Sequence, residues 1–175
     1  GSMTTFKGLF TAGDGVGASG HKFSSGSHTE GRLAAKAMVK YALDNADWKV
    51  ELDTPADELV AQIYQPVRTF LEFKDYTTAI DVNPNYITPK MLQMRLQKIM
   101  DEYVGGVSMF YVTSENLLNR GLELLAMLQE DFEHIGAEDL HQLQRAWELQ
   151  HRILTAESVT RHTLFRQETR WPGYY

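Results

Sequence analysis

Three consecutive stretches with helical apolar spacing constrain the fold more than any other feature of this sequence. They cover about residues 91–103, 114–135 and 138–165, with short connections between them. In each stretch apolar residues recur every three or four positions and share one helical face. Amphipathic helices joined in this way bury those faces as an antiparallel bundle. The sequence therefore predicts a mainly α protein in which residues 88–175 form a helical C-terminal domain, ending in a docking tail at 166–175.

The N-terminal part has a different pattern. Residues 7–12 are predicted as a short strand that stops at Gly13-Asp14-Gly15, and a glycine- and serine-rich loop follows. Ser27-His28-Thr29-Glu30 has the spacing of a capping box, so a helix is predicted to begin at Ser27 and to end near residue 45. One strand and one helix cannot form a hydrophobic core alone. We therefore expect residues 4–45 to be a piece of a larger domain.

The remaining segments complete the predicted organisation. Gly1-Ser2-Met3 resembles a protease-cleavage remnant followed by a start methionine, so residues 1–3 are treated as an expression scar. Residues 46–87 are predicted as a helix, kinked or split at Pro66, and an extended connecting loop. Gly136 is predicted to end the helix that covers residues 114–135.

Composition excludes several classes of function. The chain has no cysteine, so it can form no disulfide and offers no thiolate to an iron–sulfur cluster. Its net charge of −6 argues against general binding of nucleic acid. No apolar run approaches the ~20 residues of a membrane span, and no secretory signal is visible. We expect a cytoplasmic protein.

The loop after the predicted strand contains a G-x-G-x-x-G motif at residues 15–20. In a dinucleotide-binding unit the helix opens within the motif and a second parallel strand follows, and neither feature is present. The better interpretation is a loop that leads to a helix N-terminus, where free amides stabilise an anion or a polarised carbonyl. His21, Lys22 and His28 add donors there. A flexible Gly/Ser linker is the alternative.

Two carboxylate-x-x-His pairs could suggest a metal site of the di-iron type. They are Asp131 with His134, and Glu138 with His141. Both pairs flank one predicted turn, and the two further inward glutamates of such sites are missing. Solvated helix ends are the better interpretation, and no metal site is predicted.

Several strings resemble one family. Residues 8–18 resemble the second FAD-contacting segment of the succinate dehydrogenase and fumarate reductase flavoprotein superfamily, and residues 21–32 resemble its version in adenylylsulfate (APS) reductase α subunits. Residues 81–87, 91–103 and 145–148 and the tail also resemble that family. Lys22 stands where the quinone-linked members have an arginine that handles a dicarboxylate, which speaks against succinate or fumarate as the substrate.

The resemblance implies an FAD-dependent oxidoreductase that interconverts APS with AMP and sulfite and receives electrons from an iron–sulfur β subunit. The helix start at Ser27 and His28 would approach the pyrimidine edge of the flavin, and Asp14 would lie near the ribityl chain. No catalytic residue is identified. The implied cofactor-binding residues are Gly13, Asp14, Lys22, Ser24, Ser25, Ser27 and His28.

The resemblance also implies that the chain is incomplete. The segment that grips the ADP half of FAD and the domain that caps the substrate have no counterpart in this sequence, so the chain alone is expected to be inactive. Two alternatives remain open at this point. The chain could be a non-catalytic helical interaction module, or a fragment of another fumarate reductase-like flavoprotein.

Overall fold

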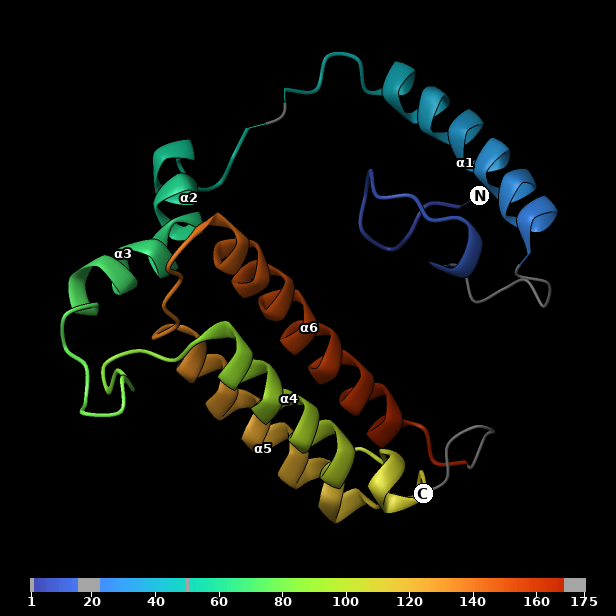
Figure 1. The fold of residues 1–175 in the computed structure, drawn as a ribbon. Coiled ribbons are helices and arrows are strands. Elements are labelled where there is room, and N and C mark those ends of the chain that lie inside the picture. The colour runs from blue at the N-terminus through green and yellow to red at the C-terminus, as the bar shows by residue number, and fades with distance from the viewer. Residues whose placement is uncertain (1, 16–22, 50, 169–175) are drawn as a thin grey trace. The chain divides into compact units, whose positions relative to one another are not determined.

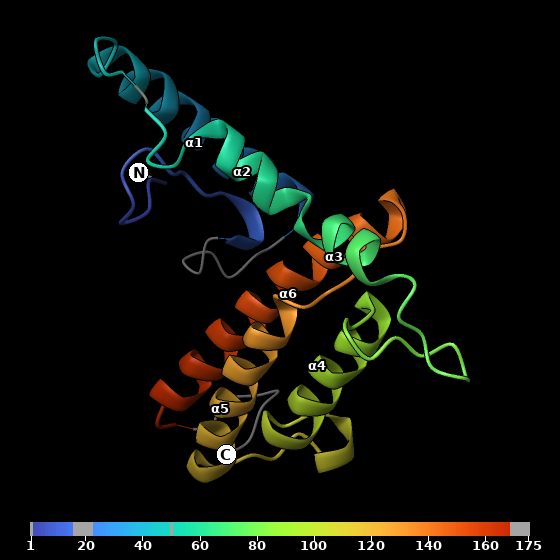
Figure 2. The same ribbon diagram turned by 90° about the vertical axis from the view of Figure 1, so that its left-hand side faces the viewer.

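The computed structural model describes residues 2–15, 23–49 and 51–168. The chain divides into two compact units, Gly1–Asp53 and Thr54–Tyr175. Figures 1 and 2 show the helices of each unit from two directions. None of the described helices is long and apolar enough to cross a membrane. The mainly α class predicted from the sequence is confirmed, since six α-helices and no sheet are described.

The first unit consists of a hairpin-like segment, the 3-10 turn η1 (Gly13–Gly15) and helix α1 (Ser24–Asp44). The predicted strand at residues 7–12 is present only as an isolated antiparallel bridge between Met3 and Phe10, because the described residues offer no further strand to pair with it. The Phe10 ring meets the Tyr41 ring of α1 edge-on, with the ring centroids 5.9 Å apart. This contact attaches the hairpin to the helix.

The second unit is built around α4 (Pro89–Tyr103), α5 (Glu115–Phe132) and α6 (Leu140–Phe165), which lie side by side in both views. Each begins at the residue type that favours a helix start, because a side-chain oxygen there accepts an otherwise unpaired amide. Thr88 accepts from Met91, Ser114 from Leu117 and Asp139 from Gln142. Inside, the three helices share one buried apolar cluster that includes Leu92, Leu125, Leu149 and Ile153. The predicted bundle is confirmed.

Two short helices precede the bundle, α2 (Ala56–Ile63) and α3 (Gln65–Phe73). The chain splits here as predicted, because Pro66 lies in the first turn of α3, where its missing N–H costs nothing. The Pro66 carbonyl accepts from the Ala137 amide at 2.9 Å, and the Trp147 ring donates to the Ile63 carbonyl at 3.0 Å. These bonds join α2 and α3 to the bundle.

The connection between α4 and α5 covers residues 104–114. It contains the 3-10 turn η2 (Val107–Met109), and Asp101 accepts a hydrogen bond from the Ser108 amide at 3.0 Å. The hydrogen bonds from Ser108 hold the pKa of the Asp101 carboxyl below its ordinary value.

Gly136 does not end α5, contrary to the sequence-based prediction. The helix ends at Phe132, and the chain then runs beside Ile87, whose amide donates to the His134 carbonyl and whose carbonyl accepts from the Gly136 amide. A Cβ at position 136 would lie 2.4 Å from the Tyr86 ring. The glycine is needed because the Tyr86 ring occupies the space that a side chain would fill.

Gly136→Ala should therefore lower the free energy of unfolding of the second unit by about 1–3 kcal/mol, the usual cost of overpacking. The measurement is urea unfolding followed by circular dichroism at 222 nm. Tyr86→Ala removes the ring atoms that an added Cβ would meet, so Gly136→Ala should cost less in that background. An equal cost in both backgrounds would contradict the assignment to the Tyr86 ring.

Candidate functional site

The turn Gly13-Asp14-Gly15 is fixed against the first turns of α1. Gly13 is buried and has a φ of +66°, a backbone conformation that side chains rarely adopt. Its amide donates to the Glu30 carboxylate over 2.7 Å, and a Cβ at this position would lie 3.3 Å from Ser27 Oγ. At Gly15, an added Cβ would lie 2.5 Å from Thr11 Oγ1. Both glycines therefore let the backbone lie close to its neighbours.

Helix α1 begins three residues before the predicted capping box. Phe23 has extended backbone angles and occupies the N-cap position without a side-chain cap bond, and α1 starts at Ser24. The Ser27 amide donates to the Phe23 carbonyl at 3.0 Å, so Ser27 lies inside the first turn and caps nothing. The Glu30 carboxylate bonds to Gly13 rather than to Ser27. The predicted capping box is therefore wrong.

The corrected start leaves a set of backbone donors at the beginning of α1. The first amides of a helix have no intrahelical acceptor. Among the described residues, no hydrogen bond from the amides of Ser24, Ser25 or Gly26 is recorded. Ser24 and Ser25 are exposed, so their amides and hydroxyls can meet a ligand. This helix end suits an electron-rich group, because the helix dipole adds partial positive charge.

The structure brings most of the predicted cofactor-binding residues into one region of the first unit. Gly13 is buried in the turn, Asp14 is exposed beside it, and Ser27 is half-buried against the turn. Ser24, Ser25 and His28 lie exposed in the first turns of α1. Lys22 and His21 lie outside the described residues, as do positions 16–20 of the G-x-G-x-x-G motif.

Glu30 is the residue whose role was missed. Its position in a capping-box pattern suggested a bond to a neighbour on the helix, whereas its recorded partner is 17 residues earlier in the chain. No local spacing pairs a glutamate with a distant glycine amide. The only sequence signal was the glycine pair itself, which indicates a backbone in close contact with something.

The sequence predicts no metal site, and the described carboxylates and histidines can be searched for one. Within those ranges, no group of three or more metal-ligating side chains is found. Asp131 instead forms an ion pair with Arg95 at 2.6 Å. Its oxygen is therefore occupied by a cation of the protein.

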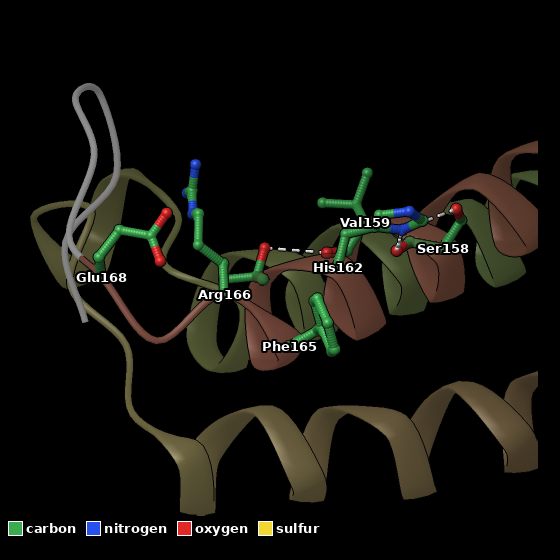
Figure 3. A pocket seen from close by; sticks show the side chains of 7 residues that line it. Ser158, Val159, His162, Phe165, Arg166 and Glu168 are labelled. Carbon is green, nitrogen blue, oxygen red and sulfur yellow. Dashed lines mark hydrogen bonds between the residues drawn. The ribbon is translucent and has the colours of Figure 1, made fainter. Parts of the chain in front are cut away.

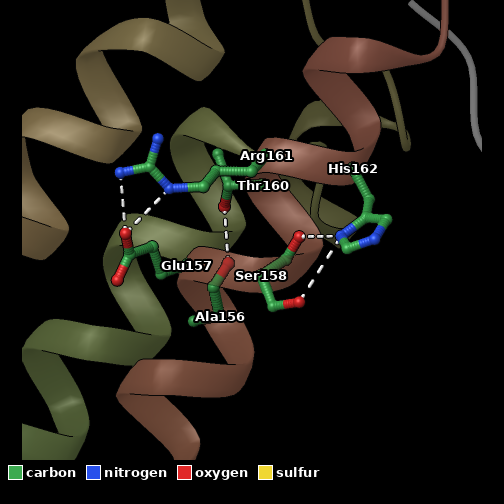
Figure 4. Close-up of polar contacts among 6 residues, drawn as sticks. All are labelled: Ala156, Glu157, Ser158, Thr160, Arg161 and His162. Atoms are coloured by element: carbon green, nitrogen blue, oxygen red, sulfur yellow. Dashed lines mark hydrogen bonds and ion pairs between the residues drawn. The ribbon is translucent and has the colours of Figure 1, made fainter. Parts of the chain in front are cut away.

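A cavity of about 600 Å³ lies at the C-terminal end of α6, around His162, Phe165 and Arg166 (Figure 3). The polar groups along this part of the helix are mostly bonded within α6 (Figure 4). His162 Nδ1 lies 2.7 Å from the Ser158 carbonyl and 3.4 Å from Ser158 Oγ, and Arg161 pairs with Glu157. No bond of His162 to a carboxylate is recorded among the described residues. The Ser158–His162 contact is therefore a helix-surface contact and does not form a catalytic triad.

Comparison with known proteins was made at the level of the whole chain. No protein-family model matches the sequence. The α subunit of adenylylsulfate reductase from Megalodesulfovibrio gigas is 50% identical over 173 residues, which are 99% of this chain and 26% of that subunit. The chain thus spans about a quarter of the length of this relative.

Solved structures give the same result. Adenylylsulfate reductase from the hyperthermophilic Archaeoglobus fulgidus matches with a TM-score of 0.91 and 56% identity, over 99% of this chain and 27% of that one. A structure of adenosine-5-phosphosulfate reductase in complex with sulfite, as a covalent adduct, gives the same values. The Mycobacterium smegmatis Sdh1 complex matches with a TM-score of 0.52 at 19% identity, which shows a shared fold alone.

Over nearly its whole length the chain is therefore similar to part of the adenylylsulfate reductase α subunit.

The contact that holds the turn can be tested directly. Glu30→Ala should make the Gly13 amide exchange with water about 10-fold faster, because a charge-assisted hydrogen bond is lost. The measurement is NMR water exchange on labelled protein. Glu51→Ala is the control, since Glu51 is exposed and has no recorded polar partner among the described residues. An unchanged Gly13 exchange rate in Glu30→Ala would contradict the assignment of Glu30 as the residue that holds the turn.

Proposed function

We propose that this chain is the C-terminal part of the flavoprotein subunit of an adenylylsulfate reductase. In this assignment residues 4–45 complete the FAD-binding domain, residues 46–87 connect, and residues 88–175 form the helical C-terminal domain with a docking tail. The complete enzyme would interconvert APS with AMP and sulfite, using FAD and electrons from an iron–sulfur β subunit. The chain alone would be inactive.

The observation that carries the proposal is the Gly13 turn held against the start of α1. The Glu30 carboxylate fixes the turn by accepting from the Gly13 amide at 2.7 Å, and the glycine lets the backbone lie against Ser27 at the start of α1. The amides and hydroxyls at Ser24 and Ser25 supply donors beside it. Donors of this kind fit the electron-rich edge of a flavin, whose negative charge grows on reduction. FAD, when bound, would supply the two-electron chemistry.

The roles of this chain's own residues follow from that arrangement. The α1 amides would orient the flavin edge and stabilise its charge. Asp14, exposed in the turn, would accept from hydroxyls of the ribityl chain. We propose Lys22 and His28 as further donors to the flavin, and Ser27 as the residue that packs against Gly13 rather than as a cap.

The first unit also supports the proposal by being incomplete. In α1 only Ala34 is buried, whereas Leu33, Val39 and Leu43 are 57%, 60% and 72% exposed. A helix with several exposed large apolar side chains needs a further surface to cover them. About three-quarters of the matched subunit lies outside this chain and offers that surface.

The partner assignment rests on composition. The chain has no cysteine, so a thiolate-bound cluster must be held by residues outside it. We place the clusters on the β subunit and the assembly in the cytoplasm.

FAD titration by calorimetry tests the proposal. The 175-residue chain should bind FAD more weakly than about 100 μM, because a helix end stabilises a nearby charge by ~2 kcal/mol at best while submicromolar binding needs more than ~8 kcal/mol. The complete α subunit should bind tightly. Stoichiometric, submicromolar binding by the 175-residue chain would contradict the incomplete-site assignment.

A glycine substitution in the complete subunit tests the site itself. Gly13→Ala should weaken FAD binding about 10-fold or more, since the positive φ is strained for alanine and the Cβ lies close to Ser27 Oγ. Gly31→Ala is the matched control, because an added Cβ there meets no atom within 4 Å in this chain. Equal FAD affinity in the two variants would remove Gly13 from the site, and retained helical content would show that folding is not the cause.

A further inference from the structure

A second concave site lies within the second unit, far from the glycine turn in sequence. A cavity of about 480 Å³ opens between the N-terminal ends of α4 and α6. Lys90 and Gln93 line it from α4, and His141, Gln142 and Arg145 line it from α6. Gln93 and Gln142 are half-buried, while the three basic side chains are exposed. The cavity therefore has amide groups within it and basic groups at its mouth.

The basic groups at this mouth differ from most others in the second unit. Among the described residues there, no ion pair or side-chain hydrogen bond is recorded for Lys90, His141 or Arg145. Arg166, at the other end of α6, is the one further lysine or arginine of the described second unit without a recorded side-chain partner. Arg68 donates to the Ala61 carbonyl, and the ion-paired cations are Lys74, Arg95, Lys98, Arg120, Arg152 and Arg161. Unpaired cations thus gather at one cavity in a protein whose net charge is −6.

The carboxylates nearest in sequence are engaged elsewhere. Asp139 accepts from the Gln142 amide at 2.8 Å as the cap of α6. Glu138 accepts a hydrogen bond from the Gln142 side-chain amide at 3.4 Å. Burial, and then the charge of Glu138, raise the pKa of the Tyr86 phenol. Neither carboxylate lines the cavity. Its positive charge is therefore left for a ligand.

We propose that this cavity binds an oxyanion of the phosphate and sulfate class. Arg145 presents a planar fork of donors to two oxygens, and Lys90 supplies a compact charge from the opposite helix. Gln93 donates amide hydrogens, Gln142 can donate the amide hydrogen that does not bond to Glu138, and His141 adds a ring donor. The backbone amides of Met91 and Gln142 already donate to Thr88 and Asp139, so they contribute only the partial positive charge of the two helix N-termini. This site does not depend on the flavin assignment.

The size of the cavity allows two sources for the anion. A volume of about 480 Å³ exceeds the needs of a free ion and lies in the range of small-molecule pockets, about 300–1,000 Å³. The anion could be free phosphate or sulfate, or the phosphate of a nucleotide such as AMP. The shared chemistry is the tetrahedral dianion, and separate titrations distinguish the sources.

The test is an NMR titration of the labelled 175-residue chain with sodium phosphate, sodium sulfate and AMP, each at constant ionic strength set with sodium chloride. Amide shifts should be confined to residues 88–93 and 141–145, with a dissociation constant for phosphate of about 1–10 mM, as expected for a few charge-assisted bonds. AMP binding at least about 10-fold tighter would support the nucleotide source, and equal affinity would support the free anion.

Variants separate this site from general charge effects. Lys90→Gln with Arg145→Gln should weaken phosphate binding about 100-fold, roughly 10-fold for each charge removed. Lys98→Gln with Arg152→Gln removes the same charge from cations that already pair with Glu102 and Glu148, and should leave binding unchanged. Unchanged binding in the first pair, equal weakening in both pairs, or shifts spread over the whole surface would overturn the proposal.

Discussion

The packing of α4, α5 and α6 around one apolar cluster is the constraint on which the second unit depends. Leu92 and Leu125 are fully or almost fully buried in it, and Leu149 and Ile153 of α6 are 2% exposed. Burial of such side chains stabilises a fold by about 1.5–3 kcal/mol each. The helix starts, the Ile87–Ile135 bridge and the α2–α3 pair are all positioned from this cluster. The cavity between Lys90 and Arg145 is therefore held on a rigid scaffold.

The first unit has no comparable interior. Its helix buries only Ala34, and the hairpin is attached chiefly through the Phe10–Tyr41 ring contact. The organised part is the glycine turn, where Glu30 and Ser27 hold the backbone against α1. An ordered glycine turn on an incompletely buried unit is expected of a segment whose remaining contacts come from elsewhere in a larger domain. The second unit therefore supplies the stable core, and the first unit is the part that we propose to contact the cofactor.

Much of this fold could be predicted from sequence because its determinants are local. The starts of α4 and α5 follow from Thr88 and Ser114 and the apolar spacing after them, and the split before Pro66 follows from the chemistry of proline. The misassigned features depend on distant residues. Glu30 bonds to Gly13, and Gly136 faces Tyr86, so neither partner could be read from nearby spacing. The unpaired state of Lys90 and Arg145 likewise depends on which acids the fold places near them.

Native-state hydrogen exchange of the 175-residue chain tests the central claim, that a self-contained helical unit is joined to an N-terminal unit whose core is incomplete. Amides in α6 around Leu149 and Ile153 should exchange only on global unfolding of the second unit. Amides in the middle of α1, around Ala37 and Tyr41, should exchange at least about 100-fold faster, because little burial opposes local opening. Equal protection of α1 and α6 in a demonstrated monomer would contradict the account.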